Sequence, residues 1–272
     1  MTRIQEFGYR GLDTEGVARI VSAHGDYYHL VCNEAEGEII ARKKKSAFMS
    51  KDALKPITGD FVRFRYNNCG ESQILEILPR FSVFERKDPT VRRKSQVLAV
   101  NFDILFIMMS LNENLSVARL ERFLVLAENM GAAEVKVILT KRDLISDEEF
   151  NELPDIFKSS NTLAISAKNN FGIDKISEIV SCGKTVAFVG SSGVGKSTLL
   201  NTLAGEEWQA TQEIQEWSGK GRHTTTSREL IMLPSGAMII DTPGIREIGI
   251  VGEIDDILVK GVSTHRYRRK GL

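Results

Sequence analysis

The chain has 272 residues, 42% of them hydrophobic and 26% charged, an ordinary composition for a soluble globular protein with room for two domains. Its 36 basic and 36 acidic side chains balance, so the total charge indicates no polyanionic partner. The three cysteines form no C-x-x-C pair, so neither a disulfide framework nor a zinc knuckle is indicated, and a reducing, cytoplasmic setting is expected. The longest apolar run, residues 104–111, is too short to span a bilayer, and no membrane role is expected.

The N-terminal residues 1–80 alternate short β-rich runs with turn signals such as His24-Gly25-Asp26. Short strands rich in β-branched and aromatic residues, separated by glycine turns, favour a small all-β barrel. We expect an OB-like β-barrel over this region. Residues 1–96 carry 17 Lys and Arg against 13 Asp and Glu, and such local positive charge can attract nucleic acid.

Residues 81–96 are polar and charged and contain Pro89, which predicts a linker. Beyond the linker the pattern changes to apolar strands that alternate with amphipathic helices. Such alternation is typical of a parallel α/β sheet, and we expect one α/β domain over residues 97–250.

A phosphate-binding loop matching G-x-x-x-x-G-K-[ST] follows the apolar strand 185–189 and opens a helix. Its glycines permit a tight turn whose backbone N–H groups point at phosphate oxygens, and the helix dipole adds positive potential. Lys196 would reach the β- and γ-phosphates, and the hydroxyl of Ser197 would bind Mg²⁺. The predicted nucleotide-binding residues of this loop are Gly190, Ser191, Ser192, Gly193, Val194, Gly195, Lys196, Ser197 and Thr198.

Two further segments carry metal-side candidates. Asp241 stands at the end of an apolar strand, 44 residues after Ser197, and is followed by Thr-Pro-Gly244. An aspartate in this position can hold Mg²⁺ through water, and the Gly244 N–H can meet the γ-phosphate. Between the two motifs lies a Gly- and Thr-rich stretch, in which Thr224, Thr225 and Thr226 are candidates for a threonine that reaches Mg²⁺; Thr225 aligns best with related GTPases. The predicted metal set is therefore Ser197, Thr225 and Asp241.

The base-reading candidates lie upstream of the phosphate loop. Guanine, unlike adenine, offers an N1–H and a 2-amino group to one carboxylate, and Thr140-Lys141-Arg142-Asp143 follows an apolar strand as the T/N-K-x-D motif of GTPases does. Asp143 would read guanine while the stem of Lys141 packs over the base. Ser166-Ala167-Lys168 follows the next strand and is similar to the loop whose backbone N–H contacts guanine O6. The joint occurrence of these two motifs at strand ends predicts GTP rather than ATP, although the phosphate loop alone leaves an ATPase open.

Because the base-reading motifs precede the phosphate-binding ones, the GTPase domain would be circularly permuted. A compact α/β sheet tolerates such a change, since termini that lie close together can be joined and a surface loop opened. The predicted fold class is therefore α/β, with an N-terminal OB-like β-barrel followed by a circularly permuted P-loop GTPase domain.

Over about residues 15–258 the chain resembles the small-subunit-dependent, RsgA-type ribosome assembly GTPases. The resemblance lies in the barrel stretch ITGDFVRF, the strand NFDILFIMMS and the loop GRHTTT. The resemblance implies GTP hydrolysis stimulated by the small ribosomal subunit, binding to 16S rRNA, a role in late subunit maturation and a monomeric state. Ile245 stands where many GTPases carry a water-orienting glutamine. In the resembling family a histidine is thought to take that role, which makes His223 the catalytic candidate.

Residues 251–272 depart from the family, which ends in a zinc-binding domain with clustered Cys and His. Here no cysteine appears, and the short basic tail would be a truncated or divergent counterpart, so zinc is not expected as a cofactor alongside GTP or GDP and Mg²⁺. This departure leaves a second hypothesis open: an rRNA-binding structural factor whose GTP site senses nucleotide but hydrolyses it weakly.

Overall fold

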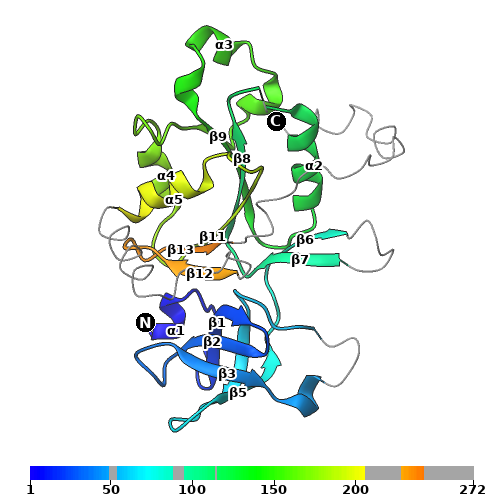
Figure 1. Ribbon diagram of the computed structural model, residues 1–272, viewed down its shortest axis with the longest axis vertical. Coiled ribbons are helices and arrows are strands. Elements are labelled where there is room, and N and C mark those ends of the chain that lie inside the picture. Colours follow the sequence, from blue (N-terminus) through cyan, green and yellow to red (C-terminus); the bar gives the residue numbers. More distant parts are fainter. Residues whose placement is uncertain (49–53, 88–94, 114, 206–227, 242–272) are drawn as a thin grey trace.

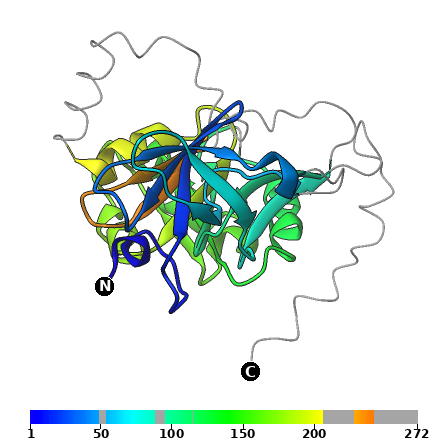
Figure 2. The ribbon, with the colours of Figure 1, turned by 90° about the horizontal axis from the view of Figure 1, so that it is seen from below.

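The computed structural model describes residues 1–48, 54–87, 95–113, 115–205 and 228–241, which form a β-barrel and a layered α/β unit stacked on it (Figure 1). The barrel lies at the lower end in Figure 1, and Figure 2 shows the ribbon of the molecule from this end. No helix within the described ranges is long and apolar enough to cross a membrane.

Five strands close the barrel. β1 pairs with both β2 and β4, β2 pairs with β3, β3 runs parallel to β5, and β5 pairs with β4, which completes the ring β1-β2-β3-β5-β4. A closed five-stranded barrel of this connectivity confirms the predicted OB-like fold. The strands are β1 (Val17–His24), β2 (Tyr27–Cys32), β3 (Ile39–Lys43), β4 (Phe61–Arg65) and β5 (Ser72–Ile77), with the short helices α1 (Arg3–Glu6) and η1 (Lys45–Phe48) beside them.

The barrel core follows from the two-residue period of its strands. Ala18 and Ile20 of β1 point into the barrel, as do the buried Tyr28 and Leu30 of β2. Tyr27, the first residue of β2, is 41% exposed. Successive side chains of a strand face opposite sides, so a register shift of one residue would expose this core. The aromatic residues of β2 therefore divide between packing and surface.

The segment expected as a linker has regular structure. Residues 81–96 include β6 (Val83–Lys87) and the start of β7 (Ser95–Val100), which pair as an antiparallel ribbon. The buried side chain of Phe84 joins the core of the α/β unit, so this ribbon packs with that unit and does not extend freely.

The α/β unit contains a six-stranded sheet in the order β10-β9-β8-β11-β13-β12. All neighbours in it are parallel except β12, which forms a hairpin with β13 around the predicted turn at Pro234-Ser235-Gly236. The carboxyl ends of the parallel strands therefore share one edge. The strands are β8 (Ile104–Ser110), β9 (Glu134–Thr140), β10 (Thr162–Ala164), β11 (Thr185–Gly190), β12 (Glu229–Met232) and β13 (Met238–Asp241).

Helices cover both faces of this sheet (Figure 1). All seven residues of β8 are buried, with Leu105, Ile107 and Met109 in the cluster that α2 completes. Ile104, Phe106 and Met108 belong to the other cluster, which α4 and α5 complete. A strand buried on both faces has few polar positions, which explains the apolar run that continues in this sequence up to Ser110. The helices are α2 (Val117–Ala127), α3 (Asp147–Asn151), α4 (Ile173–Ile179) and α5 (Lys196–Ala204), with the short turns η2 (Arg142–Leu144) and η3 (Asp155–Lys158).

The barrel and the α/β unit share a buried arginine. Arg19 of β1 is fully buried and donates to the Thr185 hydroxyl at 2.9 Å and to the Asn101 carbonyl at 2.7 Å. Burial lowers the pKa of its guanidinium to about 9, against the opposing attraction of Asp103 and Asp60, so the group stays charged at neutral pH. A buried charge is tolerated only where such partners surround it, which fixes the barrel on the sheet.

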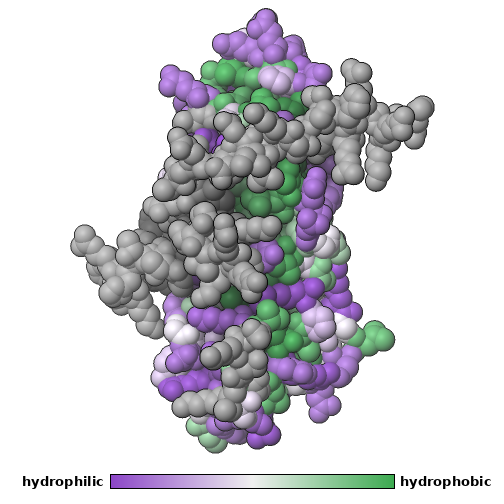
Figure 3. Space-filling model, turned by 90° about the vertical axis from the view of Figure 1, so that its right-hand side faces the viewer, coloured by the Kyte–Doolittle hydropathy of each residue, from purple (hydrophilic) through white to green (hydrophobic). Residues whose placement is uncertain are grey.

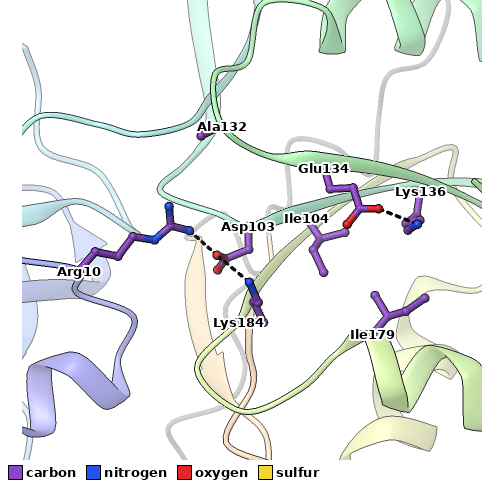
Figure 4. Close-up of a pocket in the computed structure, with 8 residues that line it drawn as sticks. All are labelled: Arg10, Asp103, Ile104, Ala132, Glu134, Lys136, Ile179 and Lys184. Carbon is purple, nitrogen blue, oxygen red and sulfur yellow. Dashed lines mark hydrogen bonds and ion pairs between the residues drawn. The ribbon is translucent and has the colours of Figure 1, made fainter. Parts of the chain in front are cut away.

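A second contact lies at the amino-terminal edge of the sheet, opposite to the edge where the strands end. Asp103, just before β8, accepts from the backbone N–H of Thr185 at 2.7 Å and pairs with Arg10 and with Lys184 (Figure 4). A cavity of about 380 Å³ opens beside these residues, and Glu134 and Lys136 pair on its far side. The N-terminal segment is thereby attached to the base of the sheet.

Within the barrel, Asp60 and Arg80 form a buried ion pair. Arg80 donates to the two carboxylate oxygens at 2.7 and 2.8 Å, and the backbone N–H of Ile57 adds a third bond at 2.9 Å. Burial raises the pKa of Asp60, and the bonds from Arg80 oppose that shift. The pair is therefore sensitive to the loss of either partner.

We expect Arg80→Met to destabilise the protein by about 3–5 kcal/mol, because it leaves the Asp60 carboxylate buried without its cation. Urea denaturation followed by circular dichroism measures this loss. The matched control is Arg63→Met, which removes the exposed pair with Asp13 and should cost far less. Equal losses in the two variants would contradict the importance of the buried pair.

Candidate functional site

The loops that follow β9, β10 and β11 meet at the carboxyl-terminal edge of the sheet. They enclose a cleft of about 250 Å³. Base-reading and phosphate-binding candidates, which are separated by about fifty residues in the sequence, line this one cleft together. Its lining residues are Thr140, Lys141, Asp143, Leu144, Ile165, Ala167, Lys168, Gly195, Thr198 and Leu199.

The phosphate loop has the backbone that its glycines predict. Gly193 and Gly195 have φ angles of +70° and +101°, in the left-handed region that favours glycine. A Cβ on Gly190 would stand 2.7 Å from the carbonyl oxygen of Met108, so only glycine permits this approach of β11 to β8. The Lys196 ammonium donates to the Gly190 carbonyl at 3.0 Å, which folds this cation over its own loop.

Helix α5 begins at Lys196 directly after this turn, so its N-terminal end faces the cleft. Ser197 and Thr198 in its first turn are exposed, while Leu199 is buried and anchors the helix on the sheet. A helix N-terminus with exposed hydroxyls is suited to bind an anion and its metal ion. Ser191 and Ser192 lie in the turn that precedes it, where Val194 N–H bonds to the Ser191 carbonyl at 3.4 Å.

Asp143 is exposed in the cleft and is held by Ser166. The Ser166 hydroxyl donates to one carboxylate oxygen of Asp143 at 2.6 Å, and Asn169 N–H donates in turn to that hydroxyl at 3.3 Å. The bond from Ser166 lowers the pKa of Asp143, with smaller contributions from Lys168 and Lys141. The carboxylate is thus ionised and oriented. The Ser166 side chain is buried and orients the carboxylate, and contact of its loop backbone with a nucleotide stays a prediction.

The turn that carries Asp143 has a specific backbone. Lys141 has a φ angle of +59°, and the backbone N–H of Arg142 donates to the Ile165 carbonyl at 3.0 Å. The Arg142 guanidinium also donates to the Ile145 carbonyl at 2.6 Å and stacks on the Phe150 ring. These bonds join the two base-side loops. Arg142 occupies the variable position of the motif, so the sequence alone indicates no role for it.

Thr140 connects the base side of the cleft to the phosphate side. Its buried hydroxyl donates to the Val194 carbonyl at 2.6 Å and lies 3.2 Å from the Met109 carbonyl. Val194 is in the middle of the phosphate loop. Thr140 therefore positions that loop from a neighbouring strand, a role that follows from the parallel pairing of β8, β9 and β11.

Part of the predicted site lies outside the described residues. His223, Thr225 and Gly244 belong to that part, as does the side chain of Asp241, whose backbone ends β13. In the part of the chain with described coordinates, no three His, Cys, Asp or Glu side chains form a metal-binding cluster.

The sheet order, the phosphate loop and the base-side carboxylate define a P-loop nucleotide-binding domain in which the base-side strands come first in the chain. A family model described as RsgA GTPase matches residues 77–251. This match covers more than half of the sequence, and the chain belongs to the RsgA GTPase family.

Two relatives illustrate the match. The chain is 41% identical to "Small ribosomal subunit biogenesis GTPase RsgA 2" of Lactiplantibacillus plantarum over 236 residues, which are 86% of this chain and 66% of the relative. It is 39% identical to the corresponding RsgA of Leptospira interrogans over 238 residues, 86% of this chain and 65% of that protein. The chain thus spans slightly less than two thirds of the length of these relatives.

Two crystal structures share the fold. YjeQ from Thermotoga maritima superposes with a TM-score of 0.62 at 23% identity, over 84% of this chain and 74% of that one. YloQ, described as a circularly permuted GTPase, gives a TM-score of 0.56 at 23% identity, over 86% of this chain and 74% of that one. The predicted arrangement of a barrel followed by a permuted P-loop domain is confirmed.

We expect Thr140→Val to destabilise the protein by about 1–3 kcal/mol, because the Val194 carbonyl loses its buried donor. Amide exchange in residues 191–195 should accelerate, and hydrogen-exchange mass spectrometry measures it. Thr162→Val on β10 is the control, since its hydroxyl contacts only the exposed Ser159. Unchanged stability and exchange in Thr140→Val would show that this bond does not position the loop.

Proposed function

We propose that this chain binds GTP with Mg²⁺, hydrolyses it to GDP and phosphate, and acts in this way in the assembly of the small ribosomal subunit. The observation that supports this most directly is the single cleft lined by Asp143 and Lys168 on one side and by Gly195 and Thr198 on the other. A nucleotide that lies across it would meet a carboxylate at its base and a helix N-terminus at its phosphates.

Selection of guanine depends on how many hydrogen bonds the carboxylate of Asp143 can still accept. A carboxylate has about four lone-pair sites, and the Ser166 hydroxyl uses one of them. The remaining sites suffice for the N1–H and 2-amino donors of guanine. Adenine would present no such pair of donors, so it would leave the oriented carboxylate unpaired at a considerable cost. Lys141 and Lys168 flank the base site, where the stem of Lys141 would cover the base.

The phosphate side needs one rearrangement. Lys196 donates to the Gly190 carbonyl, and binding of a triphosphate would replace that carbonyl with phosphate oxygens, which are the stronger acceptors. Ser197 and Asp241 offer hydroxyl and carboxylate oxygens, the hard donors that Mg²⁺ prefers, and both stand where the parallel strands end. Thr225 as a metal ligand, the N–H of Gly244 at the γ-phosphate and His223 as the residue that positions water complete the proposed set.

The proposed partner follows from the relatives, which are named as small-subunit biogenesis GTPases. The barrel surface seen in Figure 3 is largely hydrophilic with scattered apolar residues. On β2 and β3, the exposed Tyr27 stacks against the guanidinium of Arg42 at 4.1 Å, a pair that suits contact with RNA bases and phosphates. We therefore propose that the barrel binds 16S rRNA. The proposed protein is a cytoplasmic monomer, and zinc is not proposed as a cofactor.

We expect Asp143→Asn to weaken GTP binding by about 10- to 100-fold, because an amide replaces one charged acceptor with a donor. The same change should improve binding of xanthosine triphosphate, whose 2-carbonyl accepts from that amide. Fluorescence titration with labelled nucleotides measures both affinities. Asp147→Asn is the matched control, since Asp147 pairs with Arg142 outside the cleft. Unaltered preference for GTP over ATP in Asp143→Asn would refute guanine reading by this residue.

Turnover tests the rest of the proposal. We expect slow GTP hydrolysis by the chain alone and faster hydrolysis with purified small subunits, and Lys196→Ala should abolish both, since it removes the phosphate-binding cation. Phosphate release under multiple turnover measures the rates. Tight subunit binding without stimulated turnover would instead favour an rRNA-binding factor that senses nucleotide. Ile245, which stands where many GTPases carry a water-orienting glutamine, is also compatible with this second hypothesis.

A further inference from the structure

One row of backbone pairs runs from the barrel into the nucleotide-binding sheet. Ser22 of β1 pairs with Glu229 of β12, and Glu229 pairs with Asp241 of β13. Because adjacent strands lie about 4.8 Å apart, Ser22 is roughly 10 Å from the residue that ends β13. A barrel strand thus adds to the α/β sheet beside the hairpin that carries Asp241.

A bulge in β1 makes this contact possible. The pairing of β1 with β2 shifts register between Ile20 and Ser22, so that Val21 is the extra residue. A β-bulge bends its strand and increases its twist, and bulges are frequent where a strand changes partners. The first half of β1 stays in the barrel with β4, and the second half approaches β12.

Side chains of the barrel hold the same hairpin at two further points. The buried Thr58 donates its hydroxyl to the Arg228 carbonyl, directly before β12, at 2.9 Å. Arg19 lies 3.3 Å from the Met238 sulfur and bonds to the Thr185 hydroxyl. Thr185 and Met238 are paired residues of β11 and β13, so Arg19 spans the first register pair of these strands.

These contacts converge on a short element. The hairpin has four residues in each strand. At one outer end the barrel bonds to Arg228, directly before β12. At the other outer end stands Asp241, the proposed metal ligand. The loop that carries Thr58 is itself bonded to β1, through Gly59 N–H to the Ile20 carbonyl at 2.8 Å. Movement of the hairpin would therefore act on the contacts that it makes with β1 and with residues 57–60.

We propose that the barrel is a positioning element of the nucleotide site, in which Thr58 acts through the Arg228 carbonyl on the β12–β13 hairpin. The inference rests on the proposed GTP binding. If Asp241 helped to hold Mg²⁺ beside the γ-phosphate, a displacement of this residue would pass through the hairpin to Ser22 and to residues 57–60. Linkage is reciprocal, so a polyanion that moves the barrel changes the affinity for GTP by the same factor.

The test compares amide exchange of the full chain with GDP and with a non-hydrolysable GTP analogue. We expect exchange in β1 and in residues 57–60 to differ between the two nucleotides by about fivefold or more, the lower end of usual coupling strengths. β3 and β5 on the far side of the barrel should exchange equally in both. Equal exchange in every part of the barrel, with both nucleotides bound, would overturn the coupling and leave the proposed function intact.

Two variants assign the coupling to Thr58. Thr58→Val should remove most of the difference in exchange, while Thr58→Ser, which keeps the hydroxyl, should retain it. The affinity for GDP should change less than about threefold in either variant, because residue 58 does not line the cleft. Persistence of the full difference in a folded Thr58→Val protein would refute the role of this residue. Failure of the wild-type chain to bind either nucleotide would overturn the proposed function, and the coupling with it.

Discussion

The site depends on the parallel, in-register pairing of β8, β9, β11 and β13. Parallel strands must end at the same edge, and the residues that follow them are brought together whatever their separation in the sequence. This constraint explains why permutation of the chain leaves the cleft intact. The order in which the strands are connected affects the loops on the far side, whereas the chemistry depends only on which strand ends are neighbours.

Much of the architecture could be predicted because its signals are local. The strand ends before Asp143, Ser166 and Gly190 follow from apolar runs that stop at polar or glycine residues, and the barrel strands follow from their two-residue period. Family likeness supplied the roles of these motifs, and the matching model and relatives confirm that membership.

The sequence did not predict contacts between residues that lie far apart along the chain. The bond from the Ser166 hydroxyl to Asp143, which orients that carboxylate, joins residues 23 positions apart. Arg19 had no visible signal, since a lone arginine in a strand pattern is ordinarily a surface residue, and only the stacking of barrel on sheet buries it. The ribbon β6–β7 was not predicted because its two short strands adjoin a charged, proline-containing stretch of sequence that favoured a linker. Each case involves partners that lie far away in the sequence.

The attachment of β1 to β12 also has a consequence for solubility. β12 is the outermost strand of the nucleotide-binding sheet, and the barrel covers part of its free edge at Glu229. An uncovered edge offers unpaired N–H and C=O groups to other chains and is a template for aggregation. By covering part of this edge, the barrel protects the sheet from pairing with other chains. A fragment that begins after residue 80 would present this edge to its own copies and would tend to precipitate.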